Sequence, residues 1–115
     1  MRILVAIALV LFVSGCSARM AFRESVVGLW QFPFRGAWVE IRHDGSAFQC
    51  RVAEDGEVIY SRGHLSGRTI FWEQGWRSDR LTLSAAVLTL DGEHGKFEFL
   101  RAADAMSDSC RAAKG

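Results

Sequence analysis

From residue 26 onward, the chain alternates between short runs rich in apolar residues and short polar breaks. Several runs alternate residue by residue, as in 47–53, where Phe48, Cys50 and Val52 share one side of an extended chain. A period of two is typical of β-strands with one buried face. The pattern predicts eight short strands, at residues 26–32, 37–43, 47–53, 58–65, 69–75, 80–84, 87–91 and 96–101.

The breaks between these runs are rich in turn-forming residues. Asp44-Gly45 and Asp55-Gly56 are typical of hairpin turns, because glycine adopts positive φ at little steric cost. Consecutive strands joined by tight turns form an antiparallel meander, and closing the meander into a barrel removes exposed strand edges. We therefore predict an all-β fold, an eight-stranded up-and-down antiparallel meander that closes into a small barrel. An open sheet or a flattened sandwich is the alternative.

Helical periodicity is weak along the same part of the chain. No segment of helical length carries an apolar stripe with a period of 3.6 residues. The tail at residues 102–110 is long enough for one or two helical turns.

The first residues follow a different pattern. Arg2 precedes an apolar run from Ile3 to Val13, which is too short to cross a bilayer comfortably as a permanent helix. A charged start followed by such a run is typical of a secretory signal. We assign residues 1–15 to a signal peptide that is not part of the fold.

The apolar run ends in Val13-Ser14-Gly15-Cys16, which resembles the lipobox of bacterial lipoproteins. The resemblance implies cleavage before Cys16, a diacylglycerol on its sulfur and an acyl chain on its new amino group. Two or three chains anchor a protein stably, because each buried methylene contributes about 0.8 kcal/mol. Ser17, in place of an aspartate, implies the outer membrane, with the protein facing the periplasm. The alternative is an ordinary thiol at Cys16 after a conventional cleavage site.

The mature chain is long enough for one domain. We take residues 16–25 as the lipidated cysteine and a polar spacer, and residues 26–115 as the barrel domain with its C-terminal tail. Removing residues 1–15 from 115 leaves 100 residues, enough for one domain and too few for two. Because Arg2 leaves with the signal, 13 basic residues face 13 acidic ones, which argues against a nucleic-acid partner.

Two cysteines remain in the domain. In an exported protein an even pair indicates a disulfide first, so we expect Cys50 and Cys110 to be bridged. Two buried free thiols are the alternative. A metal site is disfavoured, because no second cysteine or histidine lies at ligand spacing from either one.

The two ends of the predicted barrel carry a pair of matching motifs. Gly28 and Trp30 lie in the first strand and Arg101 ends the last, which resembles small lipocalin-like barrels. The resemblance implies that the Arg101 guanidinium lies across the Trp30 ring where the barrel closes, a cation–π contact worth about 0.5 to 2 kcal/mol. Gly28 is expected to let the backbone bend at the base of the barrel. The resemblance indicates an architecture and no particular ligand.

Catalytic patterns are weak in this sequence. His43 and His94 fall in predicted turns and His64 ends a strand, as expected of solvated residues. Glu40 and Glu73 each fit the outward face of a strand. No nucleophile motif such as G-x-S-x-G is present, and the glycines are scattered as turn residues. We therefore expect a protein that is not an enzyme and that holds no cofactor and no metal.

Aromatic residues are abundant for so short a domain, and not all of them fit in one core. Phe71 and Trp72 are adjacent, so a regular strand directs them to opposite faces and leaves one ring exposed or at a barrel mouth. Phe32, Phe34 and Trp38 are expected to surround the loop after the first strand. The candidate ligand-binding residues are Trp38, Tyr60, Trp72 and Trp76. The alternative is that these rings cap the barrel.

These features favour a non-catalytic binding or structural module, anchored in the bacterial envelope, for a small apolar ligand or an envelope component. Its expected partners are the membrane, through the acyl chains, and a small apolar ligand or a protein. The alternative is a lysozyme-inhibitor-like protein, because small lipid-anchored barrels with one disulfide resemble such inhibitors. The loops near 43–46 and 76–80 are then the candidates for insertion into an enzyme cleft.

Overall fold

The chain folds into a closed barrel. The computed structural model describes residues 20–34, 36–75 and 77–115, so the predicted signal peptide and Cys16 lie outside the described residues. Within these ranges, eight strands follow one another around the barrel in sequence order. The last strand pairs with the first, Trp30 opposite Arg101 and Gln31 opposite Leu100. This pairing closes the sheet, which confirms the predicted eight-stranded antiparallel meander and excludes an open sheet.

The strand bounds agree with the predicted runs to within a few residues. The strands are β1 (Gly28–Phe32), β2 (Ala37–Ile41), β3 (Ser46–Val52), β4 (Val58–Ser66), β5 (Thr69–Trp72), β6 (Ser78–Ser84), β7 (Val87–Gly92) and β8 (Gly95–Arg101). β2 ends before residue 43 because the Asp44 carboxylate accepts hydrogen bonds from the Ser46 amide and hydroxyl, which fixes a turn there. β5 ends at Trp72, before residue 75, and Gly75 has a positive φ of 74°.

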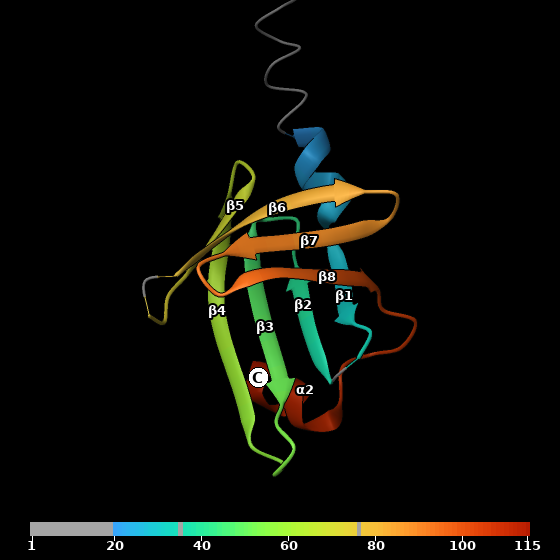
Figure 1. Cartoon of the computed structure of the whole chain (residues 1–115), viewed down its shortest axis with the longest axis vertical. Helices are drawn as coiled ribbons and strands as arrows, with labels where there is room; N and C mark the ends of the chain where they lie inside the picture. Colours follow the sequence, from blue (N-terminus) through green and yellow to red (C-terminus); the bar gives the residue numbers. More distant parts are fainter. Residues whose placement is uncertain (1–19, 35, 76) are drawn as a thin grey trace, which may run out of the picture.

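The barrel consists of two sets of strands that cross one another. β1 to β4 run close to the long axis, and β6 to β8 lie across them (Figure 1). Apolar side chains from both sets meet between them. The buried members from the strands are Trp30, Val39, Ile41, Ala47, Leu65, Ile70, Trp72, Leu81, Leu88, Leu90 and Phe99. The space inside this barrel is therefore a side-chain core.

Residues 20–26 form an N-terminal helix that covers one end of the barrel, here called the closed end. Phe22 and Val26 lie four residues apart on one helical face, and both are buried in the barrel core. Arg68, from the β4–β5 turn, lies over the Phe22 ring at 4.2 Å. The expected spacer is thus wrong for residues 20–25, which belong to the folded domain. Two buried apolar positions in seven residues do not stabilise an isolated helix, so this helix depends on the barrel end that it covers.

Donors from β1 and β8 meet the end of the N-terminal helix. The Trp30 indole Nε1 donates to the Val26 carbonyl at 2.9 Å, and the Arg101 guanidinium donates to the carbonyls of Ser25 and Val27 at 2.7 and 2.6 Å. Arg101 Cζ also lies 4.0 Å from the centroid of the Trp30 ring, so the predicted contact is present. The last carbonyls of a helix lack helical partners and attract cations. One arginine therefore caps the helix where the barrel closes.

Gly28 makes room for this arginine, which differs from the predicted role as a bend. A Cβ at Gly28 would lie 2.5 Å from Arg101 Nη1, and its φ of 133° is one that other residues rarely adopt. Glycine is thus favoured at this position because the guanidinium approaches the backbone closely.

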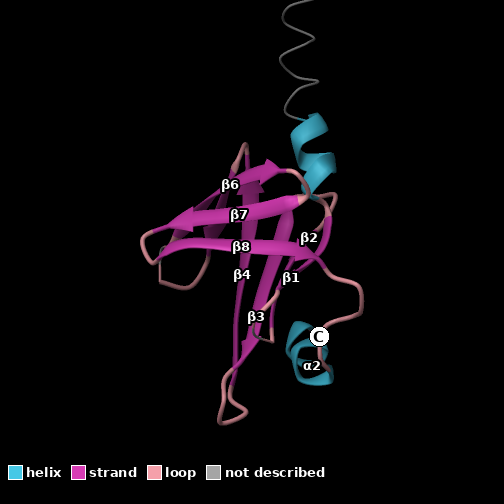
Figure 2. Ribbon diagram, turned by 45° about the vertical axis from the view of Figure 1, so that its right-hand side comes forward, coloured by secondary structure: helices cyan, strands magenta, loops and turns pink. Residues whose placement is uncertain are grey.

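A second apolar cluster lies on the outer face of the barrel, beneath the C-terminal helix α2 (Asp108–Lys114). Figure 2 shows α2 and the N-terminal helix at opposite ends of the strands. The disulfide Cys50–Cys110 joins β3 to α2 with Cα atoms 5.9 Å apart, which confirms the predicted bridge. The buried members of this outer cluster are Trp38, Phe48, Cys50, Met106 and Cys110. β3 is therefore covered on both faces, by the barrel core and by α2.

The tail helix is displaced from the predicted residues 102–110. Ser107 is the N-cap of α2, its hydroxyl accepts a hydrogen bond from the Cys110 amide at 3.3 Å, and Asp108 lies in the first turn. Serine at the cap and an acid in the first turn both favour a helix start at this point. Met106, just before the cap, packs into the outer cluster.

Candidate functional site

Four phenylalanine rings contact one another at the barrel end opposite the N-terminal helix. We call Phe32, Phe34, Phe97 and Phe99 the aromatic patch. The Phe32 ring centroid lies 5.9 Å from that of Phe34, 6.3 Å from that of Phe97 and 5.7 Å from that of Phe99. These separations are typical of favourable aromatic pairs. Phe99 is only 6% exposed, whereas Phe97 is 43% and Phe34 is 84% exposed. The patch extends from the core into solvent.

Strand direction brings these rings together. β1 runs away from the N-terminal helix and ends at Phe32, and β8, which is antiparallel to β1, begins at that same end. Phe97 and Phe99 lie two residues apart and so point to the same side of β8. Pro33 follows β1 and has no N–H to continue the ladder. The chain turns there, and Phe34 lies outside the strand.

His64 and Phe71 form a second exposed aromatic surface, on the outer face of β4 and β5. Their rings stack with centroids 5.7 Å apart and an interplanar angle of 28°. Phe71 is 45% exposed and Trp72 only 3%, which confirms that the two adjacent rings point to opposite faces. An open cleft of about 580 Å³, the lateral cleft, is lined by His64, Ser66, Phe71, Trp72, Glu73 and Arg77.

The candidate ligand-binding residues of the sequence analysis lie in different parts of the molecule. Trp38 is buried in the outer cluster beneath α2. Tyr60 is exposed on the outer face, with its ring 6.0 Å from that of Phe48. Trp72 is in the barrel core, where its indole donates to the Asp79 carboxylate at 2.7 Å. Trp76 lies outside the described residues. Alternation along the strands explains the separation, since Trp38 and Tyr60 point outward and Trp72 points inward.

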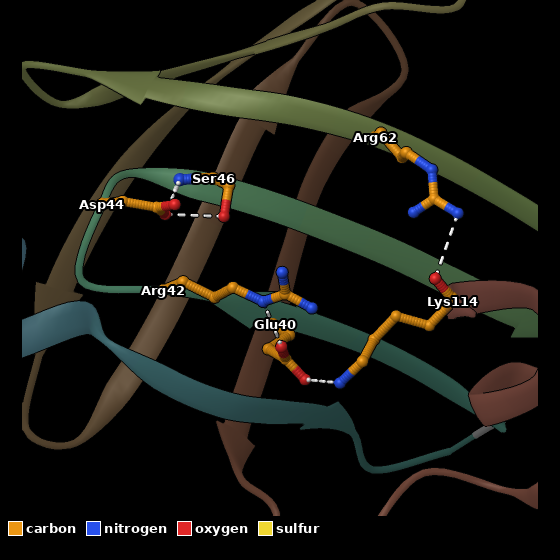
Figure 3. Close-up of polar contacts among 6 residues, drawn as sticks. All are labelled: Glu40, Arg42, Asp44, Ser46, Arg62 and Lys114. Carbon is orange, nitrogen blue, oxygen red and sulfur yellow. Dashed lines mark hydrogen bonds and ion pairs between the residues drawn. The ribbon is translucent and has the colours of Figure 1, made fainter.

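Polar contacts fasten α2 to the barrel near the disulfide (Figure 3). Glu40 accepts hydrogen bonds from Lys114 Nζ at 2.8 Å and from Arg42 Nε at 3.0 Å. Arg62 donates to the carbonyls of Ala113 and Lys114, each at 3.2 Å. Carbonyls at the end of a helix lack helical partners, so Arg62 satisfies groups that the helix itself leaves open.

The Glu40 carboxylate is held in its ionised form. Burial alone would raise its pKa, but the hydrogen bonds and positive charges of Lys114 and Arg42 outweigh burial, so the pKa lies below its ordinary value. In the β2–β3 turn, hydrogen bonds from the Ser46 hydroxyl and amide lower the pKa of Asp44. Both carboxylates have structural roles, one at α2 and one in a turn.

Among the described residues, neither 43–46 nor 78–80, from the two segments proposed for insertion into an enzyme cleft, forms a long free loop. Residues 43–46 form a tight turn closed by the Asp44 bonds to Ser46 and by a Gly45 amide bond to the Arg42 carbonyl at 2.9 Å. The prediction of a loop at 76–80 is wrong from Ser78 onward, because residues 78–80 belong to β6. The Asp79 carboxylate accepts a hydrogen bond from the Trp72 indole there, which links β6 to β5.

The described surface shows apolar and aromatic features rather than a cluster of ligating groups. Among residues 20–34, 36–75 and 77–115, no three histidine, cysteine, aspartate or glutamate side chains are grouped to hold a metal ion. No helix in these ranges is long and apolar enough to cross a membrane. His43 and His94 are exposed in turns, as predicted, whereas His64 stacks on Phe71.

The chain matches no protein-family model, no curated protein and no solved structure. The resemblance to lipoprotein signals therefore rests on residues 1–16, and the lipocalin-like resemblance rests on the number of strands and on Gly28, Trp30 and Arg101. Function must be argued from the geometry of this molecule.

Proposed function

We propose that this protein is a lipoprotein of the bacterial envelope that binds a small apolar ligand, or an apolar part of an envelope component, at the aromatic patch. Acyl chains on Cys16 anchor it in the outer membrane, facing the periplasm. Its role is binding rather than catalysis. The aromatic patch supplies the contact surface, and the barrel and its disulfide hold that surface in place.

The observation that carries this proposal is the exposure of Phe34 and Phe97 beside rings that are part of the core. Phe34 is 84% and Phe97 43% exposed, while Phe99 beneath them is buried. Covering one phenylalanine ring fully is worth roughly 1.5 to 3 kcal/mol. A ligand that covers both rings gains at most about 3 to 6 kcal/mol, which corresponds to dissociation constants from several millimolar down to a few tens of micromolar. Exposed connected rings of this kind are typical of a contact surface.

The patch is tested with an uncharged apolar dye, N-phenyl-1-naphthylamine, whose fluorescence rises when it leaves water. Replacing both exposed rings, Phe34→Ser with Phe97→Ser, is expected to lower dye affinity by about tenfold or more, because most of the apolar contact area is lost. The matched control is Phe71→Ser, which removes a ring of similar exposure, 45%, from the lateral cleft.

The control also gives the outcome that would contradict the proposal. If Phe71→Ser abolishes dye binding and the double variant does not, the binding surface is the lateral cleft and the aromatic patch has no such role. Circular dichroism melts of each variant establish that the fold persists.

The anchor is tested separately, by growing cells that express the full chain with radioactive palmitate. Label is expected in the wild-type protein and in Cys110→Ser, and none in Cys16→Ser. The mass of the N-terminal peptide is expected to show cleavage before Cys16 and the added acyl chains. A mature protein that begins elsewhere and carries a free thiol would refute lipidation.

A further inference from the structure

Arginines gather at the closed end of the barrel. Arg23 belongs to the N-terminal helix, and the ideal Cβ position of Gly45, in the β2–β3 turn, lies 3.4 Å from its guanidinium carbon. Arg42 lies in that same turn with its side chain 53% exposed, and Arg68 lies in the β4–β5 turn over the Phe22 ring. Glu24 and Asp44 lie in the same helix and turn, and Arg42 Nε donates to Glu40 at 3.0 Å, so these carboxylates offset part of the charge. Arg101 adds a further cation where β8 ends.

The far end of the barrel has the opposite sign. The β3–β4 turn at residues 53–57 contains Glu54, Asp55 and Glu57, all of them exposed. Figure 1 shows this turn projecting beyond the rest of the barrel, at the end away from the N-terminal helix. Arginines thus surround the N-terminal helix, and the turn at the opposite end of the long axis is acidic, although the mature chain is formally neutral.

The covalent chain links the basic end to Cys16. Only residues 17–19 separate Cys16 from the helical residues that begin at residue 20, and four fully extended residues span at most about 14 Å. This distance is less than two Debye lengths, since the Debye length is about 8 Å in physiological salt. The acidic turn lies beyond the nine residues of β4, which span about 30 Å, and so lies several Debye lengths from the closed end.

We propose that the closed end docks on the anionic headgroup phosphates of the bilayer that carries the acyl chains, through Arg23, Arg42 and Arg68. Docking directs the acidic turn and the aromatic patch away from the membrane. Each basic residue near an anionic surface strengthens binding by roughly fivefold. Guanidinium groups also suit phosphate, because they present several N–H donors in one plane. This orientation rests on the acyl anchor of the proposed function, and the aromatic patch is then presented to the periplasm.

The experiment reconstitutes the purified full-length mature lipoprotein into vesicles of phosphatidylcholine alone or with one third phosphatidylglycerol. Amide hydrogen exchange is measured for the turns at 42–45, 67–68 and 53–57. The anionic vesicles are expected to slow exchange at 42–45 and 67–68 at least fivefold, and to leave 53–57 unchanged. Half-molar sodium chloride is expected to abolish the difference, because salt screens the surface potential.

Charge variants separate docking from a structural role of the arginines. The double variant Arg42→Gln with Arg68→Gln is expected to lose the slower exchange on anionic vesicles, because each lost arginine weakens binding to the anionic surface roughly fivefold. Arg42→Lys with Arg68→Lys keeps the charge and is expected to retain it. The matched control, Arg51→Gln with Arg111→Gln, removes the same charge near the far end and on α2, and is expected to behave as wild type.

The outcomes distinguish this inference from the proposed anchor. Protein that stays with both kinds of vesicle but shows no dependence on lipid charge at 42–45 and 67–68 refutes docking and leaves the anchor intact. Protection at 53–57 instead refutes the orientation. Protein that leaves neutral vesicles but binds anionic ones refutes the acyl anchor and supports the arginine surface.

Discussion

The two ends of this barrel use aromatic residues in opposite ways. At the closed end, Trp30 is covered by the Arg101 guanidinium, and its indole N–H meets a helix carbonyl. At the far end, Phe34 and Phe97 remain exposed although they contact buried rings. The closed end is stabilised by the barrel core and by the Arg101 bonds to the N-terminal helix. The far half is stabilised on its outer face by α2 and the disulfide. The two ends therefore differ in how much aromatic surface they leave in solvent.

The largest expected difference between the ends is in stability. Trp30→Ala removes a fully buried ring and is expected to cost about 3 to 5 kcal/mol of unfolding free energy. Phe34→Ala, at an exposed position, is expected to change it by less than about 0.5 kcal/mol. Urea unfolding followed by circular dichroism measures both. Equal losses for the two variants would show that the aromatic patch is structural.

The disulfide is expected to be the next largest contribution. Cys50→Ala with Cys110→Ala opens a bridge between residues 60 apart in sequence, which costs about 2 to 4 kcal/mol. Hydrogen exchange is expected to rise first in α2 and the outer cluster, while the amides of the N-terminal helix keep their protection. If hydrogen exchange rises equally at both ends, the disulfide stabilises the whole barrel and not the far half alone.

Arg101 tests the closed end alone. Arg101→Gln removes the cation over Trp30 and the charge-assisted bonds to Ser25 and Val27, and is expected to cost about 2 kcal/mol. Arg51→Gln, at an exposed position near the far end, serves as the control and is expected to be nearly neutral. If the two variants unfold at the same urea concentration, the arginine does not hold the N-terminal helix.

The smallest expected effect is a pH dependence at α2. Because the folded-state pKa of Glu40 lies below its unfolded value, its contacts contribute stability above the unfolded pKa and lose it as the pH falls through the folded pKa. Glu40→Gln is expected to cost at most about 1 kcal/mol at neutral pH and to flatten the acid limb of the stability curve. Glu54→Gln, in an exposed turn, is the control. If Glu40 causes the loss of stability at acid pH, this variant loses stability in the same pH range as the wild-type protein.

The strand pattern and the disulfide were predictable, and part of the aromatic patch was too. The runs at 47–53 and 96–101 are strands as predicted, and Phe34 lies in the loop that was expected after the first strand. Phe97 was not singled out, because its partners Phe32 and Phe34 lie more than 60 residues away in sequence. The cover over the closed end was missed for the same reason, since Phe22 is buried only by distant strands.

The sequence by itself determined which segments are extended, where the chain turns and which cysteines pair. These depend on properties that are read along the chain, namely side-chain alternation, turn conformations and the even count of cysteines in the domain. Only the tertiary structure decided which face of β3 lies under α2, which rings stay in water and at which ends the charges gather. Those properties depend on contacts between residues far apart in sequence, and they are fixed when β8 pairs with β1 and closes the barrel.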